Sequence, residues 1–239
     1  MEGLRLHLLG RFTCGRAGRA IELPLSTQRL TAFLGLRGPS HRSLIAGSLW
    51  PEVPEPQALA SLRTGVWRMN RLAPGVLEIV GDGLCLSPTT SVDSAAQERV
   101  VDEVLGSHMV DGSTLRVLCQ PELLSGWYDD WVMWERVRLS QLRLRALEVA
   151  ARLFVESGQF DVALRLALEA VRAEPLRETA HGVLMSVYLA EGNVSDAIHQ
   201  YRVFRDLLFR ELGLEPSPRL TQLLPQARGV DSIVTVSGG

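Results

Sequence analysis

The feature that most constrains this chain is an internal repeat, with a shift of 34 residues, in its C-terminal half. Residues 158–164 (GQFDVAL) match residues 192–198 (GNVSDAI) at the first glycine and at the alanine five positions later. At the same shift Phe154 corresponds to Tyr188, so an aromatic residue precedes each glycine. Small residues let two helices approach closely, and an aromatic side chain fills the gap between them. The chain therefore contains at least two copies of a helix pair.

This spacing is typical of tetratricopeptide-like helix pairs, and Pro175 closes the first copy. Two copies cannot bury a continuous core alone, so flanking helices at 131–145 and 217–225 are expected to cap the stack. The sequence predicts an all-α domain over residues 93–228 and a flexible tail over 229–239.

The first 92 residues carry a different pattern. Leu4, Leu6 and Leu8 alternate with polar residues, which indicates a half-buried strand. Helices are expected at 26–36, 40–50 and 57–72, and a hairpin at 76–86. Strands, three helices and a hairpin, in this order, predict a winged helix-turn-helix with an N-terminal sheet and a C-terminal wing. The expected fold class is therefore mainly α with a small β component.

Composition excludes several classes of protein. A hydrophobic content of 46% and a net charge of −2 indicate a globular rather than a disordered chain. No apolar run approaches the roughly 18 residues of a membrane span, and the N-terminus lacks the apolar core of a signal peptide. The expected location is the cytoplasm, with no membrane partner. The three cysteines form no CxxC pair and the histidines lack metal-ligand spacing, so no metal or cofactor is expected. Without a nucleophile elbow or a phosphate-binding loop, no enzymatic activity is expected.

The charges are distributed unevenly. All 25 basic residues are arginine. Residues 1–93 hold 10 arginines against 7 acidic residues, whereas residues 94–239 hold 15 against 20. A surface for nucleic acid is therefore expected in the first third of the chain.

Helix 57–72 is the candidate for reading DNA. At 100° per residue its apolar arc contains Ala58, Leu59, Leu62, Val66, Met69 and Leu72. The opposite arc has no acidic residue and contains Arg63, Thr64, Trp67, Arg68, Asn70 and Arg71, with Ser61 at its edge. A helix of this length spans about 24 Å, enough to cross a major groove. The residues expected to contact base edges are Ser61, Arg63, Thr64, Trp67, Arg68 and Arg71.

The alternative for this helix is an ordinary solvated amphipathic surface. Its position after a second helix and before a hairpin, and its outward Trp67, favour DNA binding instead. The N-termini of the two preceding helices are expected to meet DNA phosphates. The residues concerned are Gln28, Arg29, His41 and Arg42. Residues 76–92 contain no arginine, so a minor-groove arginine from the wing is not expected.

Four strings in the chain resemble a known family. They are residues 44–50 (LIAGSLW), 61–72 (SLRTGVWRMNRL), 123–132 (LLSGWYDDWV) and 211–218 (ELGLEPSP). They are similar to the SARP-type bacterial transcriptional activators, which join an OmpR-like winged helix to a tetratricopeptide-like bacterial transcriptional activation domain (BTAD). The resemblance covers about residues 1–225. One departure is Thr27, where a lysine is common in the family.

The resemblance implies a sequence-specific regulator that binds repeats in double-stranded promoter DNA, as a homodimer, and recruits RNA polymerase holoenzyme. It further implies activation of a secondary-metabolite gene cluster, such as one for an antibiotic. The competing hypothesis is a protein-interaction adaptor whose winged helix does not read DNA. The aromatic and acidic residues at 127–134 are expected to serve packing at the domain junction rather than ligand binding.

Overall fold

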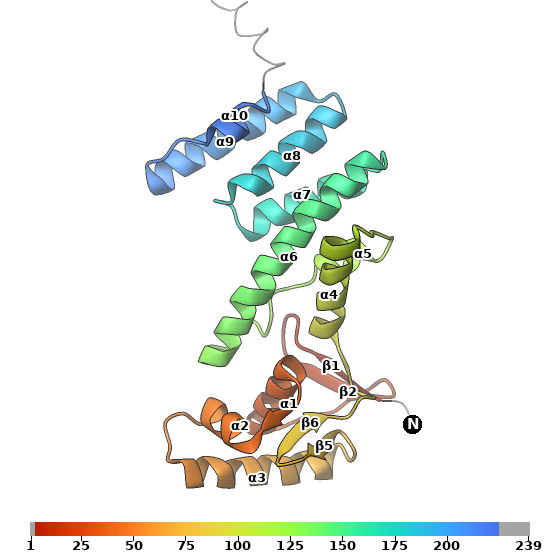
Figure 1. Cartoon of the computed structure of the whole chain (residues 1–239), viewed down its shortest axis with the longest axis vertical. Coiled ribbons are helices and arrows are strands. Elements are labelled where there is room, and N and C mark those ends of the chain that lie inside the picture. Colours follow the sequence, from red (N-terminus) through yellow and green to blue (C-terminus); the bar gives the residue numbers. More distant parts are fainter. Residues whose placement is uncertain (1–2, 225–239) are drawn as a thin grey trace, which may run out of the picture. The chain divides into compact units, whose positions relative to one another are not determined.

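The computed structural model describes residues 3–224 (Figure 1). Contacts divide the chain into two compact units. Unit 1 comprises Met1–Arg99 and Gln120–Ser140, and unit 2 comprises Val100–Cys119 and Gln141–Gly239. The fold is mainly helical with two small sheets, as predicted from the sequence. The compact units differ from the expected domains 1–92 and 93–228 because residues 120–140 return to unit 1. The expected tail at 229–239 lies outside the described residues.

Unit 1 contains two small sheets. The first has the order β3-β2-β1-β7, with β1 antiparallel to β2 and parallel to β7. Its strands are β1 (Leu4–His7), β2 (Thr13–Arg16), β3 (Arg19–Ala20) and β7 (Ser91–Val92). The second sheet, antiparallel throughout, has the order β4-β6-β5. Its strands are β4 (Ser40–His41), β5 (Leu77–Val80) and β6 (Gly83–Leu86). The alternating leucines of β1 are buried as predicted, and β5 with β6 forms the wing.

Four helices complete the N-terminal part of the chain. They are α1 (Leu25–Arg37), α2 (Arg42–Leu49), α3 (Glu55–Leu72) and α4 (Asp93–Asp102). The core of unit 1 lies between the first sheet and α1, where Leu6 and Leu8 pack with Leu30 and Phe33. Helix α3 lies against α2, α1 and β5 (Figure 1). It starts two residues before the predicted position 57, because the Pro54 carbonyl already accepts hydrogen bonds from the amides of residues 57 and 58.

A segment from the middle of the chain pairs with the end of β1. We call residues Glu122–Trp127 the docking segment. The amides of Leu124 and Ser125 donate to the carbonyls of Leu8 and Gly10, each at 2.7 Å. The docking segment thereby provides hydrogen-bond donors for the carbonyls of Leu8 and Gly10, which follow β1 and have no partner strand there. The helix that precedes the docking segment, α5 (Thr114–Leu118), ends at Leu118.

Helix α6 (Asp130–Glu156) holds the docking segment in place through Arg136. The guanidinium is buried and donates to the carbonyls of Leu123, Leu124 and Trp127 at 2.9, 2.7 and 2.9 Å. A buried cation is tolerated only when it is paired and hydrogen-bonded. Here the three carbonyls accept its hydrogen bonds, and the Glu122 carboxylate lies 3.6 Å from Nε. This contact fixes the start of α6 within unit 1.

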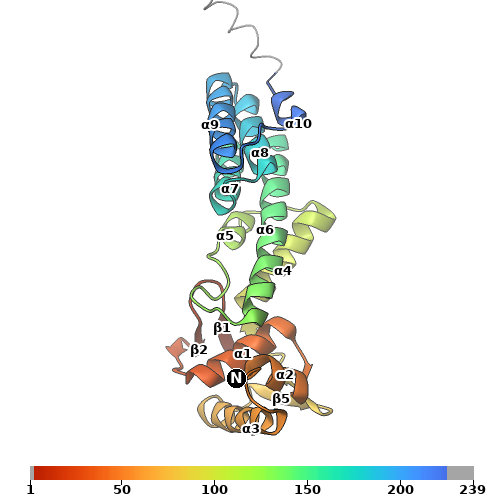
Figure 2. The same cartoon turned by 90° about the vertical axis from the view of Figure 1, so that its left-hand side faces the viewer.

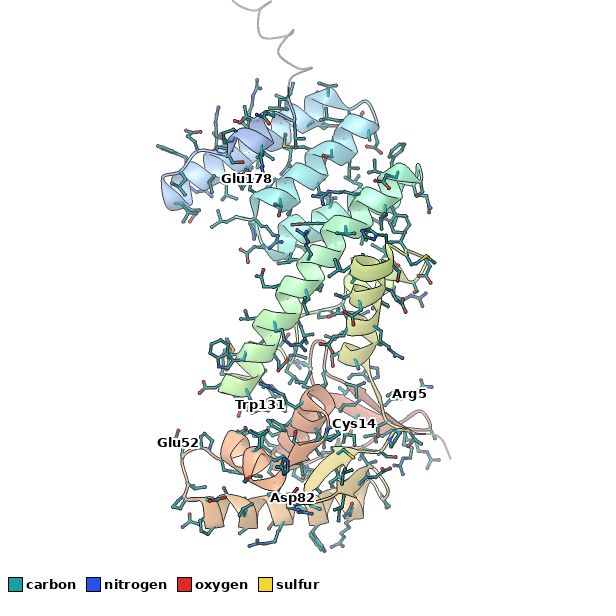
Figure 3. All side chains as sticks on the ribbon, viewed as in Figure 1. Arg5, Cys14, Glu52, Asp82, Trp131 and Glu178 are labelled. Atoms are coloured by element: carbon teal, nitrogen blue, oxygen red, sulfur yellow. The ribbon has the colours of Figure 1, made fainter. Side chains whose placement is uncertain are left out.

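The aromatic cluster at 127–134 separates into two groups. Trp127 stacks on Phe12 with ring centroids 5.9 Å apart, and Trp131 joins the core of unit 1 (Figure 3). By contrast, Tyr128 and Trp134 are 81% and 73% exposed. Trp127 and Trp131 thus pack within unit 1, whereas Tyr128 and Trp134 take no part in that packing.

Unit 2 is helical throughout its described residues. Beyond α5 and the later part of α6 it contains η1 (Glu103–Ser107), α7 (Phe160–Ala173), α8 (Glu178–Ala190), α9 (Val194–Leu212) and α10 (Pro218–Thr221). Helices α7, α8 and α9 lie side by side in both views (Figures 1 and 2). Helix α4 is followed directly by the π-helical turn η1.

The 34-residue repeat is confirmed in the backbone hydrogen bonds. The two repeat glycines have φ values of +74° and +82°, the left-handed conformation that favours glycine. The amide that follows each glycine returns to the carbonyl of the repeat aromatic residue, from Gln159 to Phe154 and from Asn193 to Tyr188, at 2.8 Å in both. The two copies therefore turn in the same way, as tetratricopeptide-like helix pairs require.

The end of the stack is closed by α10. The Glu178 carboxylate accepts hydrogen bonds from the amide of Ser217, at 2.9 Å, and from its hydroxyl. Leu220 is buried against α8, where Gly182 leaves space for its side chain. Glu178, labelled in Figure 3, thus anchors the residues that follow α9. The predicted capping role of 217–225 is confirmed over the described residues up to 224.

One buried histidine supports this unit. His181 stacks on Phe204 with ring centroids 4.2 Å apart. Its Nε2 atom donates to the carbonyl of Pro175 at 2.9 Å, and its Nδ1 atom accepts from Gln200 at 2.7 Å. Both contacts suit the neutral ring. Burial lowers the pKa of His181, and the hydrogen bond to Pro175 offsets this only in part.

We predict that Gly65→Ala stabilises unit 1 by about 0.5–1 kcal/mol, because a mid-helix glycine loses more backbone entropy than alanine. The added methyl group would lie 3.5 Å from Leu30 Cδ2, an ordinary contact. Tryptophan fluorescence during urea unfolding measures this, since all five tryptophans lie in unit 1. Gly38→Ala is the control and is expected to destabilise, because Gly38 has φ +69°. An unchanged midpoint in G65A would contradict the prediction.

We predict that unit 2 loses stability in acid through His181. Because the folded pKa lies below the unfolded value of about 6.5, the full contribution is present above that pH. The free energy of unfolding then falls as pH drops below about 6.5 toward the folded pKa. Urea unfolding followed by circular dichroism between pH 7.5 and 5 measures this loss. His181→Gln is expected to flatten the profile, whereas His199→Gln, at an exposed position of α9, keeps it. Equal slopes in both variants would refute the assignment.

Candidate nucleic-acid interface

Helix α3 presents an arginine-rich face to solvent. Leu62 and Met69 are buried and anchor the opposite side of the helix in unit 1. The exposed residues of the face are Arg63, Thr64, Trp67, Arg68, Asn70 and Arg71. Ser61 is half-buried at its edge, and Trp67 is 60% exposed. The arcs predicted from the sequence are thus formed, except that Leu72 is exposed at the end of the helix.

Two contacts organise the α3 face. The Arg71 guanidinium lies over the Trp67 ring, 5.5 Å from its centroid, in a cation–π contact. The Thr64 hydroxyl donates to the Ala60 carbonyl at 3.1 Å, so its proton is engaged within the helix. Among residues 3–224, no acidic side chain forms an ion pair with Arg63, Arg68 or Arg71. Their guanidinium donors are available to a ligand.

The two candidate phosphate contacts on α1 are engaged inside the protein. Gln28 Nε2 donates to the Leu23 carbonyl at 2.7 Å. Arg29 forms an ion pair with Asp129, just before α6, and its Nε atom is buried without a partner. The structure therefore gives Arg29 a partner within unit 1, a role that the sequence did not reveal.

The two candidates near α2 lie beside the wing. His41 Nδ1 is 2.8 Å from a carboxylate oxygen of Asp82, at the tip of the β5–β6 hairpin, and both side chains are exposed. The hydrogen bond from His41, with a smaller contribution from the charges of His41 and Arg42, holds the pKa of Asp82 below its usual value. Asp82 is labelled in Figure 3. Arg42 is half-buried at the first position of α2.

Arg29 belongs to a wider contact that we call the α1–α6 seam. Residues of α1 at helical spacing meet Asp129 and the first turns of α6. The three pairs are Arg29 with Asp129, Phe33 with Trp131, and Arg37 with Glu135. The Phe33 and Trp131 rings pack edge to face, with centroids 5.4 Å apart. The partners are about 100 positions apart in sequence, so no local sequence pattern predicts the seam.

The described residues contain neither a metal-binding cluster nor a membrane-spanning helix. No group of three or more His, Cys, Asp or Glu side chains within residues 3–224 is arranged to hold a metal ion. Over the same residues, no helix has the length and apolarity needed to cross a bilayer.

Residues 118–227 match the family model of the bacterial transcriptional activator domain. Regulatory protein AfsR of Streptomyces coelicolor is 31% identical over 237 residues, which cover 92% of this chain and 24% of that protein. AfsR of Streptomyces griseus is 29% identical over 249 residues, covering 93% and 24%. The chain thus spans about a quarter of the length of these relatives.

A solved structure shows the same fold. Mycobacterium tuberculosis EmbR, determined in complex with a low-affinity phosphopeptide, has a TM-score of 0.76 and 21% sequence identity. The match covers 96% of this chain and 66% of the EmbR chain. This likeness confirms the fold predicted from the sequence. The family model and the AfsR relatives confirm the resemblance on which the sequence prediction rested.

We predict that replacing an arginine of the α1–α6 seam lowers the stability of unit 1, whereas replacing an exposed arginine of the α3 face does not. Arg29→Ala is expected to lower the free energy of unfolding of unit 1 by about 1–3 kcal/mol, because Asp129 loses its partner in a half-buried site. Arg63→Ala, on the exposed face of α3, is expected to stay within about 0.5 kcal/mol of the parent protein. Urea unfolding followed by tryptophan fluorescence compares them. Equal losses in the two variants would show that the seam does not depend on Arg29.

Proposed function

Because this chain belongs to the SARP-type family of bacterial transcriptional regulators, we propose that it is a sequence-specific DNA-binding activator. The observation that carries the proposal is the α3 face. Arg63, Arg68 and Arg71 are exposed without an acidic partner in residues 3–224, on a helix whose other side is buried. A free arginine fork is the side chain best suited to the O6 and N7 acceptors of guanine.

The dimensions of α3 support insertion into the major groove. Its 18 residues extend over about 27 Å, and the exposed face occupies its second half. Arg63, Arg68 and Arg71 act as base readers, while Trp67 supports Arg71 and presents apolar surface to a thymine methyl group. Ser61 and Thr64 complete the reading set at the upstream edge of the same face.

Phosphate contacts position this helix in the proposal. Arg42 and His41 lie at the start of α2, where amide groups of the helix N-terminus add to the attraction for an anion. Gln28 and Arg29 remain in the predicted phosphate set. For Arg29, however, a phosphate would compete with the Asp129 carboxylate.

The proposed partners follow from the family. They are repeats in double-stranded promoter DNA, a second copy of the chain bound beside the first, and RNA polymerase holoenzyme. The proposed targets are genes of secondary metabolism, including antibiotic clusters, and the proposed compartment is the cytoplasm. We further propose that the chain acts by binding, without enzymatic activity.

One observation favours a second candidate function, that of a protein-interaction adaptor. The wing has no arginine. Its tip carries Asp82 beside His41, and Ile79 and Val80 on β5 are exposed. Such a hairpin suits a protein surface better than a minor groove. In the adaptor, the winged helix would not bind promoter DNA specifically.

We predict that Arg68→Ala and Arg71→Ala each weaken operator binding by about 1–3 kcal/mol, because each removes a base contact. Fluorescence anisotropy with duplexes from the regions upstream of neighbouring genes measures the affinity, and a footprint then locates the operator. Arg145→Ala, at an exposed position of unit 2, is the charge-matched control and is expected to bind as the parent does.

The same titrations separate the two functions. A regulator gives a specific complex whose affinity falls steeply with salt concentration. An adaptor gives no complex even at low salt and retains a stable protein partner instead. Unchanged affinity in both R68A and R71A would remove α3 from the reading role.

A further inference from the structure

Two arginines face each other across the narrow hairpin formed by β2 and β3. The register pairs Arg16 directly with Arg19. Like charges at directly opposed positions of an antiparallel pair destabilise a sheet. The connecting turn contains Ala17 and Gly18, both with positive φ, so it is tight and holds the two positions together. The free protein thus carries a local electrostatic conflict that the fold itself does not explain.

The register also tells which way these side chains point. Residues paired across antiparallel strands share one face of the sheet. Arg16 pairs with Leu4, which is buried, so Arg16 and Arg19 lie on the face that packs against the helices. Arg16 Nη2 donates to the carbonyl of Pro74 at 3.1 Å. The arginine pair is therefore placed beside the residues that immediately follow α3.

The pair has unused capacity for an anion. Arg16 is half-buried, and its Nε atom has no hydrogen-bond partner but is closed to solvent, so only the terminal nitrogens of its guanidinium can meet an external anion. Arg19 is exposed, and within residues 3–224 no carboxylate forms an ion pair with either guanidinium. An oxyanion placed between them would satisfy free donors and remove the repulsion at the same time.

We propose that Arg16 and Arg19 form a binding site for a backbone phosphate of the same DNA duplex that α3 reads. The inference rests on the proposed function. Pro74 follows Arg71 by three residues, so their Cα atoms are at most about 11 Å apart. Successive phosphates of one strand advance by about 3.4 Å along the duplex axis, so a phosphate about three steps from the Arg71 contact is within range.

This site supplies what the wing lacks. Residues 76–92 contain no arginine, so the wing offers no guanidinium at the C-terminal side of α3. The β2–β3 hairpin, near the N-terminus of the chain, places the guanidinium groups of Arg16 and Arg19 on that side instead. A phosphate contact carries no sequence information, so the pair fixes the register of α3 on the duplex rather than its base preference.

The test compares Arg19→Ala and the Arg16→Ala/Arg19→Ala double variant with Arg11→Ala. Arg11 is also exposed, but lies in the loop between β1 and β2, at the other end of that hairpin. The affinity for the operator duplex, and for duplexes with single substitutions in it, is measured by fluorescence anisotropy over a series of salt concentrations. Thermal melting without DNA is measured in parallel.

We expect the slope of log affinity against log salt to become shallower by about 0.9 for each arginine lost. The affinity is expected to fall by the same factor on every duplex, so base preference is unchanged. R11A is expected to match the parent. Without DNA, R19A is expected to melt at the same temperature as the parent or a higher one, because a like-charge contact is removed. A merely structural role for Arg19 would lower that temperature.

Two results would overturn the inference, and they differ from each other. If the parent protein binds no duplex and R68A has nothing to weaken, the proposed function fails and this site fails with it. If the parent binds and R68A weakens binding, but R19A and the double variant keep the salt slope and affinity of R11A, only the phosphate site is refuted. Arg19 forms no side-chain hydrogen bond in the described structure, so R19A remains a fair test even where the double variant folds poorly.

Discussion

The buried guanidinium of Arg136 is the contact on which the arrangement of unit 1 depends. Its three carbonyl partners all belong to the docking segment, which in turn continues the hydrogen bonding of β1. With this segment fixed, Asp129 and Trp131 meet α1 along the seam. Helix α1 also provides Leu30, against which α3 rests at Gly65. The position of α3 is thus linked, contact by contact, to a residue far along the chain.

The arginines of unit 1 fall into two groups: some form ion pairs that join helices, and others have no acidic partner among residues 3–224. Arg29 and Arg37 are neutralised by Asp129 and Glu135 and hold helices together. The arginines on α3 have no such partner among residues 3–224. A carboxylate within reach decides whether a guanidinium is a structural element or a free ligand for phosphate and base edges. The charge excess of the first third of the chain therefore overstates its free positive charge, because some of its arginines are paired with acids from residues 120–140.

Features with a local period could be predicted, and features that join distant segments could not. The arcs of α3, the β5–β6 hairpin and the 34-residue repeat each follow from spacing within one stretch of sequence. Strands β4 and β7 have two residues each, too few for any alternation to show. The ion pair of Arg29 with Asp129 joins positions 100 apart, so the phosphate role predicted for Arg29 could not be weighed against it. The facing pair of Arg16 and Arg19 depends on strand register, which the sequence of a short Gly-rich turn leaves undetermined.

The α3 face has a further consequence for control of the protein. Lysine is absent from the chain, so every cation on that face is a guanidinium. A guanidinium keeps its proton at any pH at which a protein stays folded. Acetyl and other acyl donors, which silence lysine-rich DNA contacts by capping a primary amine, find no side-chain amine there. Such a face stays cationic whatever the metabolic supply of acyl groups.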